Sequence, residues 1–327
     1  KSCSIGKRPL CFCAQTPHEP LIILIWVDDI ICCSASKDSL VDFKHKFGKA
    51  FKIKDLGVLR WFLGMQFDVK DKIISMNQSL YVKNILARFN MSDCIPRNYP
   101  CEGNVYSTLD QPSEILENRT LYQELVGSLL YLMTGTRPDL SFIVTLLSRF
   151  MHKPTKTHMN LAQGVLRYLR NTMHYDLKYV RGNNLSIIGY SDSDYANSSD
   201  SVSVSGYAFK LNDNSALISW RSAKQNLVAS STCEAEYIAM HEAGKEALFL
   251  RELFAEITNN PLRPACIWAD NQGAINLAHH PTYQRRTKHI GVIVHSTRFW
   301  IKYNLITIKY VPSKDNIADI FTKPLVG

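Results

Sequence analysis

Short apolar runs separated by polar turns fill residues 1–106, which is the pattern of strands and amphipathic helices rather than of one long helix. The predicted elements are a strand over Leu21–Ile31, a basic amphipathic helix over Lys37–Ala50, a hairpin formed by Val58–Phe67 and Lys72–Met76, and a helix over Ser79–Phe89. Residues 107–182 change to a helical spacing, because apolar side chains recur every three or four positions. The helical elements predicted there are a stripe through Tyr122, Leu125, Leu129 and Leu132, then Asp139–Phe150 and His158–Arg170.

From residue 183 to residue 327 the pattern changes again. Three strands come first, over Leu185–Tyr190, Gly206–Leu211 and Leu217–Trp220. The elements that follow are a long helix over Thr232–Ile257, a strand over Ala265–Ala269, helices over Asn271–Ala278 and Gly291–Tyr303, a strand over Leu305–Val311 and a helix over Lys314–Phe321. Three successive strands followed by alternating helices and strands predict an α/β fold with a mixed sheet.

Composition narrows the class of protein. With 46% hydrophobic and 20% charged residues, the chain of 327 residues has enough apolar material for packed cores, which excludes a disordered tail. Its formal net charge of +9 favours a polyanionic partner such as nucleic acid. A membrane partner is not expected, because the most apolar run, Leu21–Val27, is too short to cross a bilayer. The first residues, without a methionine, indicate a cut into a longer coding sequence.

Four acids stand at strand ends and helix starts of the last zone. They are Asp192, Glu234, Asp270 and Asp319. Each also has a structural explanation: Asp192 in a turn, Glu234 in a capping box with Ser231, Asp270 as an N-cap, and Asp319 as a surface helix acid. Together they favour a shared site, because strand ends in one α/β sheet converge on the same edge.

Convergent carboxylates repel one another and need cations to stay ionised together. Two Mg²⁺ ions would meet that need, activate a water and stabilise the leaving oxygen of a phosphodiester. The four acids therefore predict metal-dependent phosphodiester hydrolysis.

The last zone contains the segments GYSDSDYA, SGYAFKLN, ISWRSAKQNLVASSTCEAEYIA, ADNQGAINLA, RRTKHI and YVPSKDNIADIFTKPL. These segments resemble the ribonuclease H domain of copia-type LTR retrotransposon Pol polyproteins. Upstream segments resemble the reverse transcriptase of the same family: WVDDI, FKIKDLGVLRWFLGM, YQELVGSLLYLMTGTRPDLSF, LSRFMHKPTKTH and VLRYLR. The resemblance covers nearly the whole chain in the right order.

The resemblance implies three domains: a truncated reverse transcriptase palm with the start of the thumb over 1–106, a helical thumb and connection over 107–182, and a ribonuclease H-like domain over 183–327. It implies that Asp192, Glu234, Asp270 and Asp319 bind two Mg²⁺ ions, with Mn²⁺ as an alternative, and carry catalysis. Asp194 competes with Asp192 for the first position. The groups expected to contact the nucleic acid are Lys224, Arg285, Arg286, Lys288 and His289.

Asp28 and Asp29 match the aspartate pair of the polymerase palm. A polymerase needs a third carboxylate from an earlier strand, and Glu19 is the only acid before Asp28. We therefore expect no polymerase activity, with the pair serving as a hairpin turn.

The resemblance further implies an RNA–DNA hybrid as substrate, the rest of the Pol polyprotein or a complete polymerase subunit as protein partner, and a cytoplasmic location in virus-like particles, or alternatively the nucleus. The chain also departs from the family, since Gly291–Val294 replace charged residues on the late helix. Two alternatives to an active nuclease therefore stay open. One is a non-catalytic nucleic-acid-binding relic, and the other is an unstable product whose residues 1–106 are poorly ordered.

Overall fold

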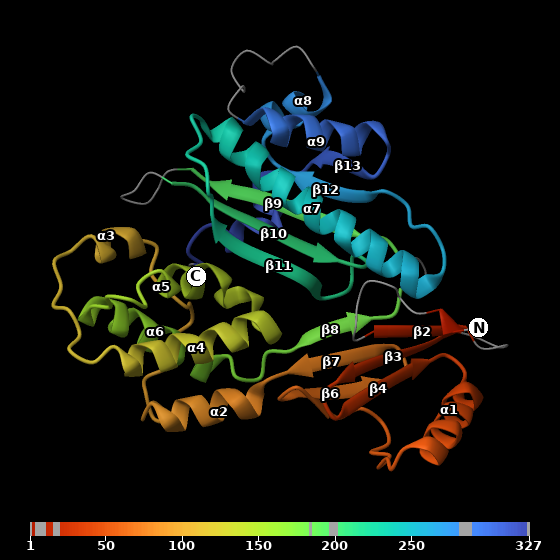
Figure 1. Ribbon diagram of the computed structural model, residues 1–327. Helices are drawn as coiled ribbons and strands as arrows, with labels where there is room; N and C mark the ends of the chain where they lie inside the picture. The colour runs from red at the N-terminus through yellow and green to blue at the C-terminus, as the bar shows by residue number, and fades with distance from the viewer. Residues whose placement is uncertain are drawn as a thin grey trace.

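Three sheets and a group of helices make up the computed structural model, which describes residues 2–3, 11–15, 20–182, 185–195, 202–280 and 290–325 (Figure 1). The strand orders are β1-β2-β3-β4, β5-β6-β7-β8 and β11-β10-β9-β12-β13. The third sheet is mixed and carries helices, so the predicted α/β class with a mixed sheet is confirmed. No helix in the described part of the chain has the length and apolar content needed to span a bilayer.

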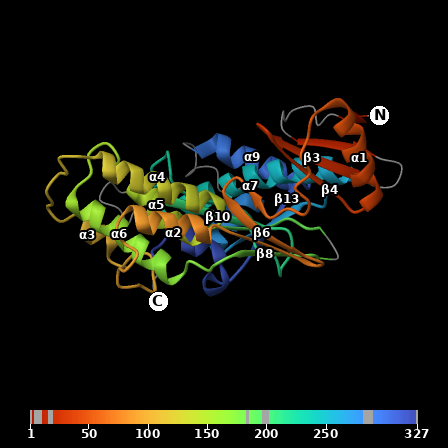
Figure 2. The ribbon, with the colours of Figure 1, turned by 90° about the horizontal axis from the view of Figure 1, so that it is seen from below.

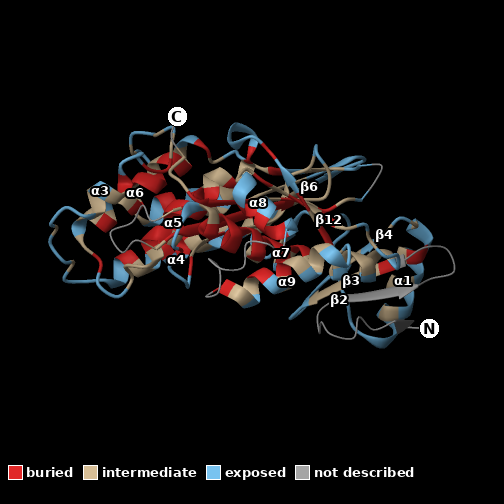
Figure 3. Cartoon of the chain, turned by 90° about the horizontal axis from the view of Figure 1, so that it is seen from above, coloured by how far each residue is buried: buried red, intermediate tan, exposed pale blue. Residues whose placement is uncertain are grey.

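The N-terminal sheet is an antiparallel arrangement with one helix beside it. Its elements are β1 (Ser2–Cys3), β2 (Cys11–Gln15), β3 (Pro20–Trp26), β4 (Asp29–Ser34) and α1 (Lys37–Ala50). The run predicted as one strand over Leu21–Ile31 is two strands, because the chain reverses at Val27, which has a φ of 52°. Between residues 21 and 77 only Leu21 and Ser39 are buried, so β3, β4 and α1 contribute almost nothing to a hydrophobic core (Figure 3).

The second sheet joins distant parts of the chain. It contains β5 (Trp61–Phe62), β6 (Met65–Lys70), β7 (Ile73–Asn77) and β8 (Leu177–Val180). The second strand of the predicted hairpin is present as β7, which pairs with β6, but the first predicted strand, Val58–Phe67, is broken by a turn at Leu63 and Gly64, where φ is positive. Strand β8 adds to this hairpin by pairing with β7 after the whole helical segment. The sequence pattern did not predict β8.

The helices between β7 and β8 form one hydrophobic core. They are α2 (Ser79–Arg88), α3 (Val105–Leu109), α4 (Thr120–Gly135), η1 (Pro138–Leu140), α5 (Ser141–Ser148) and α6 (Lys156–Asn171). They lie together at one end of the molecule, opposite the N-terminal sheet (Figure 2). Val82 and Val105 pack in the same core as Leu125 and Leu166. Packing therefore runs across the predicted division at residue 106, and the division of the chain into three domains stays a prediction.

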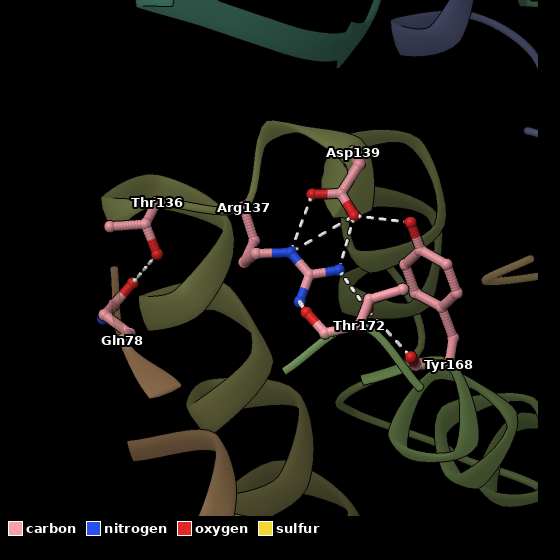
Figure 4. A network of polar contacts seen from close by, with 6 residues as sticks. All are labelled: Gln78, Thr136, Arg137, Asp139, Tyr168 and Thr172. Atoms are coloured by element: carbon pink, nitrogen blue, oxygen red, sulfur yellow. Dashed lines mark hydrogen bonds and ion pairs between the residues drawn. The ribbon is translucent and has the colours of Figure 1, made fainter. Parts of the chain in front are cut away.

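A buried arginine connects the end of α4 to α6 (Figure 4). Arg137 is only 2% exposed. Its guanidinium donates to the carboxylate of Asp139 at 2.6 Å and to the backbone oxygen of Thr172 at 3.1 Å, and Tyr168 donates to the same carboxylate at 2.8 Å. A buried charge is tolerated only when it is paired and hydrogen-bonded, so this network fixes the two helices relative to each other.

The third sheet and its helices form the C-terminal unit. Its elements are β9 (Ile188–Asp194), β10 (Val204–Lys210), β11 (Leu217–Lys224), α7 (Thr232–Thr258), β12 (Ala265–Ala269), α8 (Gln272–His279), α9 (Gly291–Lys302), β13 (Ile306–Tyr310), η4 (Ser313–Asp315) and η5 (Ile317–Phe321). Strands β9, β10 and β11 are antiparallel, whereas β12 is parallel to β9 and to β13. The helix α7 lies across this sheet, with α8 and α9 beside it (Figure 1).

The helix predicted over Lys314–Phe321 consists instead of two 3₁₀ turns. Asn316 interrupts it with an extended backbone, at φ −81° and ψ 99°. The Asn316 side chain accepts a hydrogen bond from the backbone of Ala318 at 3.1 Å and donates to the backbone oxygen of Ser191 at 3.0 Å. Such side-chain bonds compete with helix formation and fasten η5 to β9.

The helical core contacts the C-terminal unit through β11. The indole of Trp220 donates to the backbone oxygen of Met133 in α4 at 3.0 Å, and Thr145 in α5 donates to the backbone oxygen of Ser222 at 3.3 Å.

Candidate metal centre

Three carboxylates from three separate elements meet at the carboxyl end of the inner strands β9 and β12 of the third sheet. Ligand atoms of Asp192, Glu236 and Asp270 all lie within 4.8 Å of one another. Asp192 is 2% exposed and Glu236 is 9% exposed, whereas Asp270 is partly buried. This is the only group of its kind among the described residues.

The strand register explains why Asp192 and Asp270 meet. Strands β9 and β12 are parallel neighbours, with Trp268 opposite Tyr190. Carried on by two residues, the same register sets Asp270 opposite Asp192 at the carboxyl end of both strands. The convergence expected from the sequence is therefore present for these two acids.

The third acid is Glu236, and the prediction of Glu234 in this position is wrong. The Glu234 carboxylate accepts hydrogen bonds from the backbone and the hydroxyl of Ser230, at 2.8 and 2.5 Å, and its backbone donates to Ser231. It therefore caps the start of α7. Two residues further on, about 200° around the helix, Glu236 faces β9 and accepts a hydrogen bond from the backbone of Ser193 at 3.3 Å.

The sequence contained a signal for this correction. Ser231 and Glu234 form the capping pattern, so Glu234 already had a structural role. Glu236 begins the stripe that continues through Ala239, Met240 and Ala243, all of them buried. The row that begins at Glu234 and continues through Tyr237 and Ile238 is buried as well, so burial alone does not choose between the two acids.

Burial and mutual repulsion shift both buried acids toward their protonated forms. Burial, together with the charges of Asp270 and Asp319, raises the pKa of Asp192 to about 6, against the lowering effects of Thr322 and Lys323. Burial, together with the charges of Asp192 and Asp270, raises the pKa of Glu236 to about 9. An array of this kind ionises fully only when a cation compensates it.

Asp319 lies on η5, beside the group rather than inside it. Its carboxylate pairs with Lys323, and Lys323 Nζ lies 3.9 Å from Asp192 Oδ2. The Thr322 hydroxyl donates to the same Asp192 oxygen. The ammonium group of Lys323 therefore lies near both carboxylates, that of Asp319 and that of Asp192.

Asp194 is buried on the same strand as Asp192 and outside the group of three. Side chains two residues apart on a strand share a face, which explains why the sequence alone left both open. The geometry favours Asp192.

Lys224 lies at the same end of the sheet as the acids. It is opposite Val204, which in turn is opposite Asp194. Arg285, Arg286, Lys288 and His289, also predicted to contact nucleic acid, lie outside the described residues.

Asp28 and Asp29 lie at the exposed hairpin between β3 and β4, where Trp26 pairs with Asp29. Within the described part of the chain they join no acid cluster. The turn expected for this pair is present.

Comparisons with known proteins agree with the motifs. Residues 9–103 match the family described as reverse transcriptase (RNA-dependent DNA polymerase). The chain is 34% identical over 315 residues to the retrovirus-related Pol polyprotein from transposon RE1 of Arabidopsis thaliana, a match that covers 96% of this chain and 21% of that one. It is 31% identical over 244 residues to a putative transposon Ty5-1 protein of Saccharomyces cerevisiae, covering 74% of this chain and 78% of that protein. The chain belongs to the copia-type retrotransposon Pol family.

The resemblance seen in the motifs is thus confirmed, and this Pol chain spans about a fifth of the length of the RE1 polyprotein. Among solved structures, the N-terminal RNase H domain of a Mycobacterium tuberculosis protein matches with a TM-score of 0.33 at 12% identity, covering 42% of this chain and 91% of that chain.

Proposed function

We propose that the C-terminal unit is a metal-dependent ribonuclease H that hydrolyses the RNA strand of RNA–DNA hybrids. The observation that carries the proposal is the convergence of Asp192, Glu236 and Asp270 within 4.8 Å, two of them buried. Structural acids rarely gather in this way, because each buried carboxylate raises the cost of ionising the next.

The donor set suits a hard divalent cation. All three ligands are carboxylate oxygens, which Mg²⁺ and Mn²⁺ prefer over softer donors. When bound, two such ions supply an activated water and stabilise the leaving oxygen of a phosphodiester. Asp192 and Asp270 would hold the ions from the sheet and Glu236 from α7, and Asp319 would contribute from η5.

The substrate class follows from charge and from the family. The net charge of +9 favours a polyanion, and Lys224 lies at the acidic end of the sheet. We propose that Lys224, Arg285, Arg286, Lys288 and His289 contact phosphates, and that the shape and 2′-hydroxyls of the hybrid provide selectivity. The rest of a Pol polyprotein, or a complete polymerase subunit, would be the protein partner.

We further propose that this chain has no polymerase activity of its own. Asp28 and Asp29 lie in an exposed turn, and no further acid of the described residues groups with them. A polymerase site needs a third carboxylate to hold its two metal ions.

A cleavage assay on the full chain tests the nuclease. The substrate is a hybrid labelled on the RNA strand, incubated with Mg²⁺ or with EDTA. Wild type should cut only with Mg²⁺, and Asp192→Asn and Glu236→Gln should each reduce the rate by about a hundredfold or more, since each removes a metal ligand.

Glu234→Gln is the matched control, because it changes a carboxylate two residues away that caps the helix. It should cut within about threefold of wild type. Loss of cutting in Glu234→Gln with full activity in Glu236→Gln would refute the assignment. Metal-independent hybrid binding without any cutting would instead favour the non-catalytic relic.

A further inference from the structure

Lys323 places a positive charge inside the acid array. Its Nζ pairs with Asp319 and lies 3.9 Å from Asp192 Oδ2. The lysine side chain is 43% exposed, whereas that of Asp192 is 2% exposed. The ammonium group therefore lies where the buried acid meets solvent, between the two carboxylates.

The backbone fixes this position. Thr322 and Lys323 both donate their backbone N–H groups to the backbone oxygen of Asp319, at 3.1 Å each. The turn therefore sets the side chains of Asp319 and Lys323 next to each other. Asn316 fastens the same segment to β9 through Ser191.

Among the described residues, the other side of the array has no such counter-charge. Between described residues, no ion pair reaches Glu236 or Asp270. The array is therefore asymmetric, with an uncompensated side formed by Asp192, Glu236 and Asp270 and a compensated side formed by Asp192 and Asp319.

We propose that Lys323 is the counter-ion of the metal-free array, and that a divalent cation can bind between Asp192 and Asp319 only by displacing it. This inference rests on the proposed metal-dependent function. Ions then bind in order: the first enters the uncompensated side, and the second competes with the lysine. Lys323 is a positioning residue that weakens the second binding step.

Two effects follow from removing the lysine charge. The second ion should bind about tenfold more tightly, because a unit positive charge within about 4 Å of its ligands is gone. Meanwhile the metal-free protein should become less stable, because Asp192 and Asp319 lose their shared partner.

The experiment titrates the full chain with Mn²⁺ alone, without nucleic acid, and counts free Mn²⁺ by electron paramagnetic resonance. The variants are Lys323→Met and Lys323→Gln, which remove the charge, and Lys323→Arg, which keeps it. Lys314→Met is the matched control, since it removes the same charge from an exposed lysine of the preceding turn η4. Circular dichroism checks that each variant is folded.

We expect both charge-free variants to tighten the weaker Mn²⁺ step by about tenfold, while Lys323→Arg and Lys314→Met stay near wild type. Equal affinities in Lys323→Met, Lys323→Gln and Lys314→Met would overturn the role of Lys323, and so would weaker binding. If wild type shows no Mn²⁺ binding that Asp192→Asn removes, the metal centre fails, and the proposed function and this inference fail with it. If Mn²⁺ binding that Asp192→Asn removes is present, but its affinity is the same in wild type, Lys323→Met and Lys323→Gln, this inference alone fails.

Discussion

His241 should make the stability of this protein depend on pH. The ring lies between α7 and α9, where it is 9% exposed and stacks on Trp300 with 4.9 Å between centroids. Its Nδ1 lies 3.0 Å from Thr297 Oγ1. Burial lowers the pKa of His241 from 6.5 to about 4, and the nearby charges of Glu242 and Lys245 act in opposite directions.

The unfolded chain binds a proton at His241 at a higher pH than the folded protein does. Between about pH 6.5 and about pH 4 the unfolded chain protonates His241 and the folded protein does not, so acidification favours unfolding. The contribution of His241 to the free energy of unfolding is fully present above about pH 6.5 and is lost as the pH falls through this window. With those two pKa values, the loss at about pH 4.5 is about 2.5 kcal/mol.

Urea unfolding at about pH 8 and about pH 4.5 measures this loss, followed by circular dichroism. Other groups also titrate in this range, so the decisive quantity is the difference between wild type and His241→Gln. The variant should lose about 2.5 kcal/mol less than wild type on acidification. His45→Gln, which removes an exposed imidazole on α1, should behave like wild type. If His241→Gln loses as much stability as wild type, the reasoning is refuted.

Two further substitutions test the packing. At Gly206, an added Cβ would lie 2.7 Å from a side-chain atom of the turn η5, so Gly206→Ala should displace η5. The substitution should reduce hybrid cleavage by about tenfold and lower the free energy of unfolding by about 1–3 kcal/mol. Gly127→Ala, with open space around it, should leave cleavage unchanged; equal cleavage in the two variants would contradict the argument. Arg137→Met leaves Asp139 without its cationic partner and should cost about 3 kcal/mol in urea unfolding, whereas Lys46→Met, in an exposed pair, should cost less than about 1 kcal/mol. Similar costs for both would show that the buried network contributes little.

Elements with strong local signals were predictable from the sequence. The strand over Ala265–Ala269 and the helix over Lys37–Ala50 have the predicted bounds, because apolar spacing and flanking polar residues define them locally. Two failures have tertiary causes. The strand β8 forms because β7 has an open edge with which it can pair. The predicted helix over Lys314–Phe321 is interrupted because the Asn316 side chain bonds to the backbone of Ser191.

The sequence predicted where in the fold the acids converge, but it did not predict all of the residues that form the group. Asp192 and Asp270 followed from the convergence of parallel strand ends. Choosing between Glu234 and Glu236 required knowing which face of α7 meets the sheet. Both residues are buried, because the helix is covered on more than one side, so the amphipathic pattern that normally orients a helix is weak here.

The pairing of β7 with β8 has a consequence for the order of folding. Ile73 pairs with Val180, so about 100 residues of chain separate the two partners. Closing so long a loop from the unfolded chain costs considerable entropy, whereas the hydrogen bonds inside each helix join residues only four positions apart. We therefore expect the helical core to form first and to bring the two strand segments together. In that order of folding, β8 is the last strand to join its sheet. Until the helices have folded, the edge of β7 that pairs with β8 stays exposed.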